Sequence, residues 1–446
     1  MSGIAELLLN LGYEVSGSDM QRTDITDRLE SLGVRVTQGH NLLNVADADV
    51  VVYSSAVRIS NPEIVAARAR GLAVVPRAEL LAELMELRQG IAVAGAHGKT
   101  TTTSMIALIL EVAGLDPTAV IGGRVSSFGN ARLGRGKYLV AEADESDRSF
   151  LKLAPRFAVI TNIDREHLEA YRDFDDLKAA FVQFANSVPA GGAVILCADD
   201  PHLRVMRADI TRDTVTYGLE DGADVTAKDV QMKGFGCECT VVSVRPGGRP
   251  QELGRLQLSM PGRHNILNAL AAIALARELG IGFNDIGRAI AGFHGAERRF
   301  QRHGVVNGVE VVEDYGHHPT EIAAVIAAAK PIPTGRLLVA FQPHRFTRTQ
   351  FLLREFGGAF TGADVVILTD IYAAGEDPIE GVTLEALVRS VRRDFTGELR
   401  AVPALGDVPA ELARLAKAGD LIVLPGAGSI GSIVGAVLRA LESPCL

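Results

Sequence analysis

A glycine-rich turn between an apolar run and a helical pattern is the first stretch of this chain that could do chemistry. The apolar run at residues 91–94 leads into Gly95, and Gly98, Lys99 and Thr100 follow. Backbone N–H groups at such a turn face an anion, a lysine adds positive charge, and a threonine hydroxyl can ligate Mg²⁺. We expect a cradle for nucleotide phosphates here, with a plain turn between a strand and a helix as the alternative. The usual phosphate loop carries a further glycine where this chain has a valine, so the loop is a shorter form.

Acidic residues gather after a second apolar run. Residues 138–141 are followed by four carboxylates, at Glu142, Asp144, Glu145 and Asp147. Carboxylate oxygens are the ligands that Mg²⁺ prefers, and a metal ion that serves phosphate chemistry lies beside the phosphate site. We therefore expect Glu142 to bind Mg²⁺, with a solvated acidic loop as the alternative.

Histidine and arginine side chains follow other apolar runs. His167 comes after the run at residues 157–160, where a polar cap is the alternative to a functional role. Residues 313–319 carry two carboxylates and two histidines, and residues 342–349 carry one histidine and two arginines. An arginine fork suits a carboxylate, and a histidine suits proton transfer. Five of the ten histidines lie in these segments or in the glycine-rich turn, which is unusual for core histidines: His97, His167, His317, His318 and His344.

The elements that must position these residues alternate between strand-like and helical patterns. This alternation predicts parallel sheets covered by helices, with ligands at the carboxyl ends of the strands. We expect an α/β fold of three domains, residues 1–88, 89–294 and 295–446, each with a largely parallel sheet flanked by helices. Between residues 213 and 260 alternating residues and glycine-rich turns predict a small antiparallel subsheet. Asn265 then begins an apolar helix, where it either caps the helix or contacts a ligand.

The first domain reads as strands at residues 13–19, 34–37 and 49–55. A fold of the dinucleotide-binding type begins with a strand and a glycine-rich turn. This chain instead begins directly before a helical pattern at residues 4–11. We interpret this as a start codon placed too late, with an unusual fold as the alternative.

Bulk composition limits the class of protein. The 446 residues suffice for two or three domains, and a net charge of −9 with scattered basic residues argues against nucleic-acid binding. We find neither a signal-peptide pattern nor an apolar run of about 18 residues, so we expect a cytoplasmic protein that does not bind membranes. The four cysteines lack metal-ligand spacing, and we interpret them as free thiols.

The order of these motifs resembles the Mur ligases, a family of ATP-dependent enzymes of peptidoglycan synthesis. The resemblance spans the whole chain in six segments: residues 95–103, the strand end at Glu142, and residues 161–168, 261–265, 297–300 and 314–321. The shorter glycine loop is the form that this family carries. The resemblance implies a UDP-sugar-binding Rossmann-like first domain, a P-loop ATPase-like central domain and a Rossmann-like C-terminal domain that binds the amino acid.

Within the family, residues 315–318 and 342–349 are similar to the branch that joins L-alanine to UDP-N-acetylmuramate through an acyl phosphate. The branch that recycles a tripeptide onto the same sugar is the alternative, and it typically differs at both segments. Phe181 stands where sister ligases for later amino acids carry a carbamylated lysine that binds Mg²⁺, which agrees with the L-alanine branch. Ser429 stands where relatives usually carry an aspartate, so we expect one polar contact to be lost.

The resemblance implies roles for individual residues. The implied ATP-binding residues are Gly95, His97, Gly98, Lys99, Thr100, Thr101, Asn265, Asn268, Arg298 and Asp314. The implied Mg²⁺ ligands are Thr100, Glu142 and His167. The implied contacts to the UDP-sugar and the amino acid are Asp19, His40, Ser54, Ser55, Arg77, Tyr315, His317, Arg345 and Arg348. The implied catalytic residues are Lys99, His317, His344, Arg345 and Arg348.

The implied cofactors are ATP and Mg²⁺, and the implied partners are small molecules only, bound by a monomer or weak homodimer. Two other classes stay open as alternatives to an acid–amino-acid ligase. A phosphate-cradle NTPase or kinase would need no amine site, which the arginine- and histidine-rich segments argue against. A nucleotide-binding regulatory module would need no second metal site, which the pair Glu142 and His167 argues against.

Overall fold

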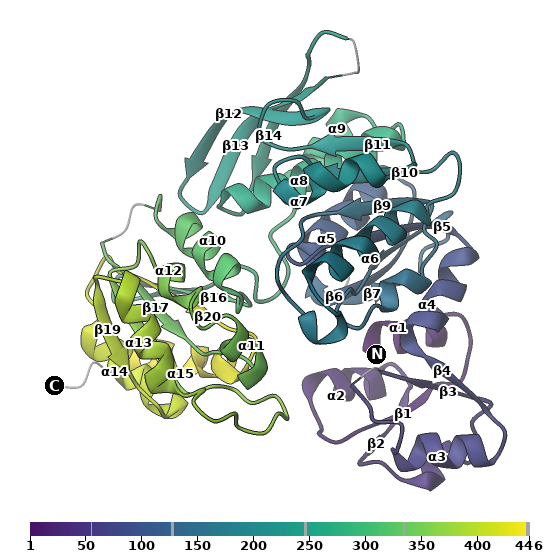
Figure 1. Cartoon of the computed structure of the whole chain (residues 1–446), viewed down its shortest axis with the longest axis horizontal. Helices are drawn as coiled ribbons and strands as arrows, with labels where there is room; N and C mark the ends of the chain where they lie inside the picture. Colours follow the sequence, from purple (N-terminus) through teal and green to yellow (C-terminus); the bar gives the residue numbers. More distant parts are fainter. Residues whose placement is uncertain (55, 126–128, 245–247, 333–334, 443–446) are drawn as a thin grey trace. The chain divides into compact units, whose positions relative to one another are not determined.

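The computed structural model describes residues 1–446 except 55, 126–128, 245–247, 333–334 and 443–446. The chain divides into two compact units (Figure 1). The predicted α/β class with largely parallel sheets is confirmed, whereas the domain boundaries at residues 88 and 294 stay predictions. Unit 1 consists of Met1–Lys228, Thr240–Arg255 and Leu267–Phe293, and unit 2 consists of Asp229–Cys239, Leu256–Ile266 and His294–Leu446.

The first ninety residues, all in unit 1, form two separate pairs of parallel strands rather than the single sheet expected. β1 (Ser16–Asp19) pairs with β2 (Arg35–Gln38), and β3 (Val50–Tyr53) pairs with β4 (Ala73–Pro76). The three predicted strands correspond to β1, β2 and β3, whereas β4, which ends in a proline, was missed. The helices of this region are α1 (Ser2–Asn10), α2 (Asp24–Ser31), α3 (Pro62–Ala69) and α4 (Arg77–Glu86).

Seven further strands of unit 1 form the sheet that carries the glycine-rich turn. Their order is β11-β10-β9-β5-β8-β6-β7, and neighbours are parallel except β6 and β7. In the register, Val93 of β5 lies opposite Glu142 of β8 and Val159 of β9, so these three strands end side by side. The elements are β5 (Gln89–Ala94), α5 (Lys99–Val112), β6 (Thr118–Val125), β7 (Gly129–Arg132), β8 (Tyr138–Glu142), β9 (Phe157–Ile160), α6 (Phe174–Asn186), β10 (Ala193–Cys197), α7 (Pro201–Met206) and β11 (Thr214–Tyr217).

Three more strands continue this sheet beyond β11, in the order β12, β13 and β14 outward from it. Only residues 234 and 235 separate β12 from β13, a connection that antiparallel neighbours use and parallel ones cannot. β12 and β13 are therefore antiparallel, as predicted for this stretch, whereas β11 and β12, within the same predicted range, pair in parallel. The elements are β12 (Val225–Lys233), β13 (Gly236–Ser243), β14 (Gln251–Leu258), α8 (Arg263–Glu278) and α9 (Phe283–Ala291).

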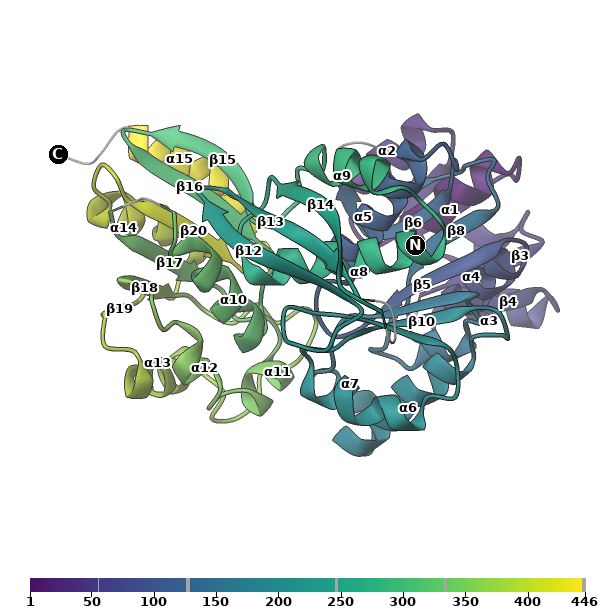
Figure 2. The same ribbon diagram turned by 90° about the horizontal axis from the view of Figure 1, so that it is seen from above.

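Most of unit 2 is a six-stranded sheet in the order β15-β16-β20-β17-β18-β19, with only β15 and β16 antiparallel. The four predicted strands correspond to β16, β17, β18 and β20. Helix α15 lies against β15 and β16 (Figure 2). The elements are β15 (Gln301–Val306), β16 (Val309–Asp314), α10 (Pro319–Ala329), β17 (Leu337–Phe341), α11 (Phe346–Phe351), α12 (Phe356–Ala359), β18 (Val365–Leu368), α13 (Leu384–Asp394), β19 (Glu398–Ala401), α14 (Val408–Leu415), β20 (Leu421–Pro425) and α15 (Val434–Glu442).

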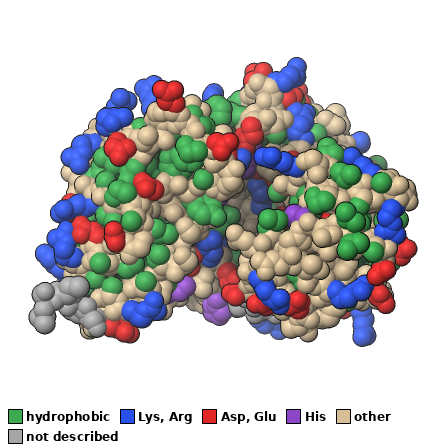
Figure 3. All heavy atoms as spheres, turned by 90° about the horizontal axis from the view of Figure 1, so that it is seen from below, with side chains coloured by type: hydrophobic (Ala, Val, Ile, Leu, Met, Phe, Trp, Pro, Cys, Tyr) green, Lys and Arg blue, Asp and Glu red, His purple; other side chains and the backbone are tan. Residues whose placement is uncertain are grey.

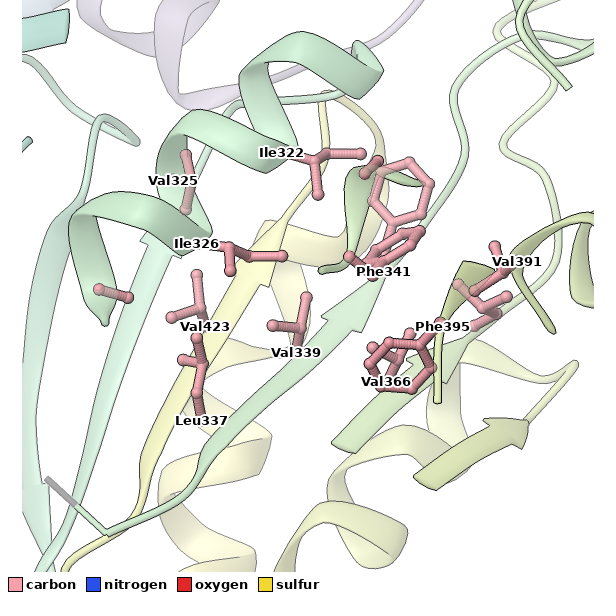
Figure 4. Close-up of a cluster of buried hydrophobic side chains, with 14 of the residues drawn as sticks. Ile322, Val325, Ile326, Leu337, Val339, Phe341, Val366, Val391, Phe395 and Val423 are labelled. Carbon is pink, nitrogen blue, oxygen red and sulfur yellow. The ribbon is translucent and has the colours of Figure 1, made fainter. Parts of the chain in front are cut away.

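Both faces of this sheet are buried, which explains why its central strands read as continuous apolar runs. Val339 and Phe341 of β17 point to the side covered by α10, where Ile322 and Ile326 pack on them (Figure 4). Leu338, from the same strand, packs in a second cluster on the opposite face. Because burying each such side chain contributes about 1.5–3 kcal/mol, the two layers fix the strand ends that carry the polar segments.

The surface is mixed in charge, as the scattered basic residues predict. On the face drawn in Figure 3, Lys and Arg side chains are interspersed with Asp and Glu side chains. Among the described helices, none combines the length and the apolar content needed to cross a bilayer. The three cysteines within the described residues are free thiols and buried, as interpreted from the sequence: Cys197, Cys237 and Cys239.

Candidate active site

The loop that follows β9 holds the glycine-rich turn between β5 and α5. Thr161 Oγ1 donates to the His97 carbonyl at 2.6 Å, and Asn162 Nδ2 donates to the same oxygen at 3.0 Å. In return, the His97 N–H donates to Asn162 Oδ1 at 2.8 Å. Gly95 has φ +131°, and a side chain there would collide with Thr161. The turn therefore requires glycine where it passes closest to the β9 loop.

Gly98 is the last residue of the turn and packs against helix α8. It adopts φ +82°, and a Cβ atom there would collide with Asn268 of α8. Asn268 Oδ1 also accepts a hydrogen bond from Thr102 of α5 at 3.3 Å. Thr101, the preceding residue of α5, is buried. The N-cap residue of α5, Gly98, has no side chain that could cap the helix. Its first N–H groups, together with the helix dipole, therefore form an anion-binding end.

Lys99 is bound by oxygen atoms on several sides. Its Nζ donates to the carbonyls of Gly95 and Ala96 at 2.6 and 3.3 Å, and to both carboxylate oxygens of Glu145 at 2.9 Å. Glu145 is 2% exposed, and burial raises the pKa of its carboxyl to about 7 although Lys99 acts to lower it. Glu145 is thus the acidic side chain that binds Lys99, through both of its carboxylate oxygens.

Thr100 and Glu142 present oxygen atoms side by side. Thr100 Oγ1 donates to Glu142 Oε2 at 3.2 Å, and Glu142 Oε1 accepts the Gly122 N–H at 2.6 Å. A hydroxyl and a carboxylate beside a phosphate cradle are the hard ligands that Mg²⁺ takes. The residues present therefore fit the metal ion that the sequence predicts.

His97 and His167 both lie beside carboxylates of the loop after β9. His97 Nε2 is 2.9 Å from Asp164 Oδ2, and its Nδ1 is 4.0 Å from Glu166 Oε2. His167, at φ +56°, has Nε2 3.8 Å from Glu166 Oε1. His97 therefore joins the turn to this loop through both its backbone and its side chain. Metal binding by His167 stays a prediction.

In unit 2, buried carboxylates shape the backbone around the end of β16. Asp314 accepts the N–H groups of Phe300 and Gly316 at 2.8 and 2.6 Å, and burial raises the pKa of its carboxyl to about 6. Arg298 Nε donates to Glu313 at 2.6 Å, and Arg298 Nη2 donates to a carbonyl of the loop after β20 at 2.7 Å. Both residues organise the loops of unit 2, and their contact with ATP stays a prediction.

Four aromatic rings form a row at the carboxyl ends of β16, β17 and β18. The Tyr315 and His317 rings meet edge to face at 5.5 Å, and His317 meets His344 in the same way at 5.6 Å. His344 in turn stacks on Tyr372, with centroids 5.6 Å apart. The two polar segments singled out in the sequence therefore come together, and the loop after β18 joins them.

Hydrogen bonds assign the tautomers of these two histidines. His317 Nδ1 lies 3.0 Å from the Tyr315 carbonyl, which only accepts, so Nδ1 carries the hydrogen. His344 Nδ1 lies 3.0 Å from Arg348 Nη1, which only donates, so this nitrogen accepts. Burial, together with the nearby His317, Arg348 and Arg345, lowers the pKa of His344 to about 4. His344 is therefore neutral at neutral pH.

Arg345 directly precedes helix α11, at its N-cap position, in a strained backbone conformation with φ +73° and ψ 137°. Its Nε donates to Glu376 Oε1 at 2.6 Å. The same carboxylate accepts from Thr347 Oγ1 at 2.7 Å and from the Thr347 N–H at 3.0 Å. One acidic residue of the loop after β18 thus holds the start of α11.

The predicted sugar-binding residues lie at strand ends of the first region. Asp19 ends β1 and lines a hollow with Thr37 and Gln38 at the end of β2. His40 Nδ1 is 3.0 Å from Ser18 Oγ, which donates to Glu63 at 2.7 Å. Ser54 directly follows β3, and Arg77 begins α4 with Nη2 3.6 Å from Asp144. The last predicted member, Ser55, lies outside the described residues.

Comparison with known proteins covers the chain from end to end. Models of the Mur ligase catalytic, middle and glutamate ligase domains match residues 1–89, 93–276 and 298–428. The UDP-N-acetylmuramate–L-alanine ligase of Syntrophus aciditrophicus is 52% identical over 443 residues, which cover 99% of this chain and 91% of that protein. The chain belongs to the Mur ligase family.

Other members show the same relationship to this Mur ligase. The UDP-N-acetylmuramate–L-alanine ligase of Geotalea daltonii is 53% identical over 431 residues, covering 96% of this chain and 93% of that protein. The crystal structure of UDP-N-acetylmuramate-alanine ligase from Thermotoga maritima matches with a TM-score of 0.84 at 28% identity, covering 100% and 97% of the two chains. A murein peptide ligase from Psychrobacter arcticus matches with a TM-score of 0.73 at 26% identity, with the same coverage.

The predicted site residues of this Mur ligase fall into two groups that the structure assembles within separate units. Unit 1 holds the glycine-rich turn, Asn268, Glu142 and His167. Unit 2 holds the ring row, the two arginines and Asn265, whose buried amide donates to the Pro261 carbonyl at 2.7 Å instead of capping α8. Phe181, in place of the sister ligases' lysine, is buried with its ring 5.1 Å from that of Phe150. Ser429 keeps a hydrogen bond with Gln342 at 3.2 Å.

Sequence reasoning missed several residues that hold the candidate groups. Glu145 belonged to the acidic cluster, but nothing in its spacing distinguished it from its neighbours. Asn162 was part of a recognised motif without an assigned role. Glu63, Tyr372 and Glu376 gave no signal, because single polar residues in loops are common and their partners are more than 20 residues away.

Proposed function

We propose that this Mur ligase joins L-alanine to UDP-N-acetylmuramate at the expense of ATP, in peptidoglycan precursor synthesis. The observation that carries the proposal is that one chain combines a phosphate cradle at Lys99 with a cluster of histidines and arginines at strand ends. A kinase would need the first and not the second. The identity with L-alanine ligases over nearly the whole chain supports the choice of substrates.

The first step would transfer the γ-phosphoryl group of ATP to the sugar's carboxylate. A carboxylate oxygen attacks γ-phosphorus, the bond to the β-phosphate oxygen breaks, and an acyl phosphate and ADP result. Two anions meet in this step, so positive charge and N–H donors are needed around the phosphates. Lys99 and the N-terminus of α5 would supply them, once Lys99 exchanges Glu145 for phosphate oxygens.

Thr100 and Glu142 would hold Mg²⁺, with His167 proposed as a further ligand. A bound Mg²⁺ would neutralise phosphate charge in this chemistry. Gly122, which donates to Glu142, would keep the carboxylate in place. Asn268 would support the cradle from behind through Gly98 and Thr102. In unit 2, we propose that Asn265, Arg298 and Asp314 contribute to the ATP site.

The second step would form the amide. The amine nitrogen of L-alanine attacks the acyl carbon, the carbon–oxygen bond to phosphate breaks, and inorganic phosphate leaves. The amine must first lose a proton. Because His317 carries its hydrogen on Nδ1, its Nε2 is the nitrogen that would accept this proton. His344, neutral and bound to Arg348, would orient that arginine instead.

The arginines would bind the carboxylate of L-alanine. A guanidinium fork matches a carboxylate with two hydrogen bonds, which a lysine cannot do. We propose Arg345 and Arg348 for this role, with Tyr315 beside them. Asp19, His40, Ser54, Ser55 and Arg77 are proposed around the UDP part of the sugar, because ligands of parallel sheets bind at the carboxyl ends of the strands.

Phosphate release from ATP and Mg²⁺ tests the proposal, measured with UDP-N-acetylmuramate and one amino compound at a time. We expect release that depends on both the sugar and L-alanine, and a product heavier than the sugar by one alanine residue in the mass spectrum. Release that requires the tripeptide and ignores L-alanine would assign the chain to the recycling branch. Release without any amino compound would point to an NTPase.

A further inference from the structure

The loop after β18 is attached to the start of α11 at two points, and sequence reasoning assigned it no function. Its backbone pairs with that of the segment after β17, because the Arg345 N–H donates to the Tyr372 carbonyl and the Tyr372 N–H donates to the Pro343 carbonyl, both at 2.8 Å. The second attachment is the carboxylate of Glu376. The two attachments enclose the residues that begin α11.

Both carboxylate oxygens of Glu376 accept hydrogen bonds from the start of α11. Oε1 accepts from Arg345 Nε and Thr347 Oγ1, and Oε2 accepts the Thr347 N–H. The N-cap residue of helix α11 is Arg345, and its side chain makes no capping hydrogen bond. Glu376 therefore performs from a distant loop the task that a capping side chain performs locally.

Arg345 needs this support because its backbone is in a conformation that residues other than glycine rarely adopt. The φ angle of +73° is unfavourable for an arginine, and such strain persists only where surrounding contacts enforce it. A residue whose backbone is held by a neighbouring loop and whose guanidinium is held at Nε has its direction fixed. Strain of this kind is concentrated at functional sites.

We propose that Glu376 is a positioning residue for the amino-acid substrate, which fixes the direction of the Arg345 guanidinium and the start of α11. This inference rests on the proposed role of Arg345 in binding the carboxylate of L-alanine. Glu376 itself touches no reacting group in this scheme. Its carboxylate pre-organises the arginine fork, so that less freedom is lost when the amino acid binds.

The proposal predicts a selective kinetic effect. In Glu376→Ala we expect the KM for L-alanine to rise about fivefold, and in Glu376→Gln about threefold, because glutamine keeps an oxygen for Arg345 but cannot accept the Thr347 N–H. The KM for ATP should stay within about twofold and the Tm within a few degrees. Glu411→Gln is the matched control, since Glu411 binds Arg414 of α14 through two hydrogen bonds at 2.9 and 2.7 Å. A purely structural role would raise all KM values or lower the Tm.

Two further measurements separate this inference from the proposed function. Adding Glu376→Ala to an Arg345→Ala variant should leave the KM for L-alanine unchanged; a further rise of about fivefold would overturn the idea that Glu376 acts through Arg345. The Nε–H resonance of Arg345, assigned with Arg345→Lys, should exchange with water at least tenfold faster in Glu376→Ala. Unchanged exchange overturns the positioning role. If the wild type does not use L-alanine while the exchange changes as expected, the proposed function fails and the hold on Arg345 stands.

Discussion

The phosphate cradle of unit 1 and the ring row of unit 2 are built in opposite ways. The cradle is one continuous segment, residues 95–101, whose glycines and backbone N–H groups form the phosphate-facing turn, and the Thr161 and Asn162 side chains hold it from outside. The ring row and its arginines come from three loops, after β16, β17 and β18, and side chains such as Glu376 hold them together. A single substitution at a glycine should therefore damage the cradle strongly. A single substitution in the ring row should have a smaller effect, because several side chains hold it together. The following expectations, from the largest effect to the smallest, test this difference.

Lys99→Ala should cause the largest loss. Removing the cation at the transferred phosphate is expected to lower kcat/KM at least about 1,000-fold, equivalent to about 4 kcal/mol of transition-state stabilisation. Phosphate release dependent on L-alanine is the measurement. Lys178→Ala, which removes a surface lysine paired with Asp175, is the control and should retain wild-type rates. If Lys99→Ala released phosphate at more than one tenth of the wild-type rate, Lys99 would not be a catalytic residue.

Gly98→Ala should damage the cradle without removing any functional group. The added Cβ meets Asn268 at a positive φ, so we expect nucleotide affinity to fall about 100-fold, or about 3 kcal/mol. Calorimetric titration with ADP measures this. Gly282→Ala is the matched control, because nothing lies within 4 Å of its Cβ position and its φ is −69°. Equal affinities in the two variants would show that the turn is not shaped by glycine.

Buried titratable groups in the two units should also respond oppositely to pH. Burial lowers the pKa of His264 in unit 2 to about 4, so the unfolded state binds more protons, and its share of stability is lost as the pH falls from 6.5 towards 4. Burial raises the pKa of Glu145 in unit 1 to about 7, so its share is present at low pH and lost as the pH rises from 4.5 to 7.

Urea unfolding of His264→Gln at pH 5.0 and 6.5 tests the first sign. As the pH falls from 6.5 to 5.0, the free energy of unfolding should decrease by about 1.5 kcal/mol less in the variant than in the wild type. The size follows because one pKa unit corresponds to about 1.4 kcal/mol. Glu145→Gln should change the slope in the other direction. Parallel pH profiles of wild type and His264→Gln would mean that this histidine is not held neutral by burial.

Arg345→Lys should have the smallest effect of the series. Lysine keeps the charge but lacks the fork and the Nε–H group, so we expect the KM for L-alanine to rise about fivefold, near 1 kcal/mol, with the KM for ATP unchanged. Steady-state kinetics with each substrate varied separately provides the measurement. A larger change in the KM for ATP than for L-alanine would assign Arg345 to the nucleotide.

The same difference explains what the sequence could predict. The cradle was predictable residue by residue, because its ligands are consecutive and a strand and a helix flank them. The buried strands β5, β8, β9, β16, β17, β18 and β20 were predictable as apolar runs. Strands β15 and β19 were missed because they lie at the sheet edges and carry polar residues, as in Glu398–Ala401.

The partners that hold the site could not be predicted. Glu376 and Glu145 each meet their partner across more than 30 residues, and no local pattern encodes such a contact. The division of the first region into two strand pairs was also not predicted, because strand runs in a sequence do not reveal which of them are neighbours. The sequence thus predicts which residues could do the chemistry, whereas the residues that hold them in place are identified only from the structure.

Transfer of ¹⁸O from the sugar's carboxylate tests the central claim, ATP-driven amide formation through an acyl phosphate, most directly. The ligase is given UDP-N-acetylmuramate labelled with ¹⁸O in both carboxylate oxygens, together with ATP, Mg²⁺ and L-alanine, and the released phosphate is analysed by mass spectrometry. The account predicts one ¹⁸O atom in each phosphate, because the attacking carboxylate oxygen leaves with phosphorus when the amide forms. Phosphate without ¹⁸O, formed together with the amide, would contradict it.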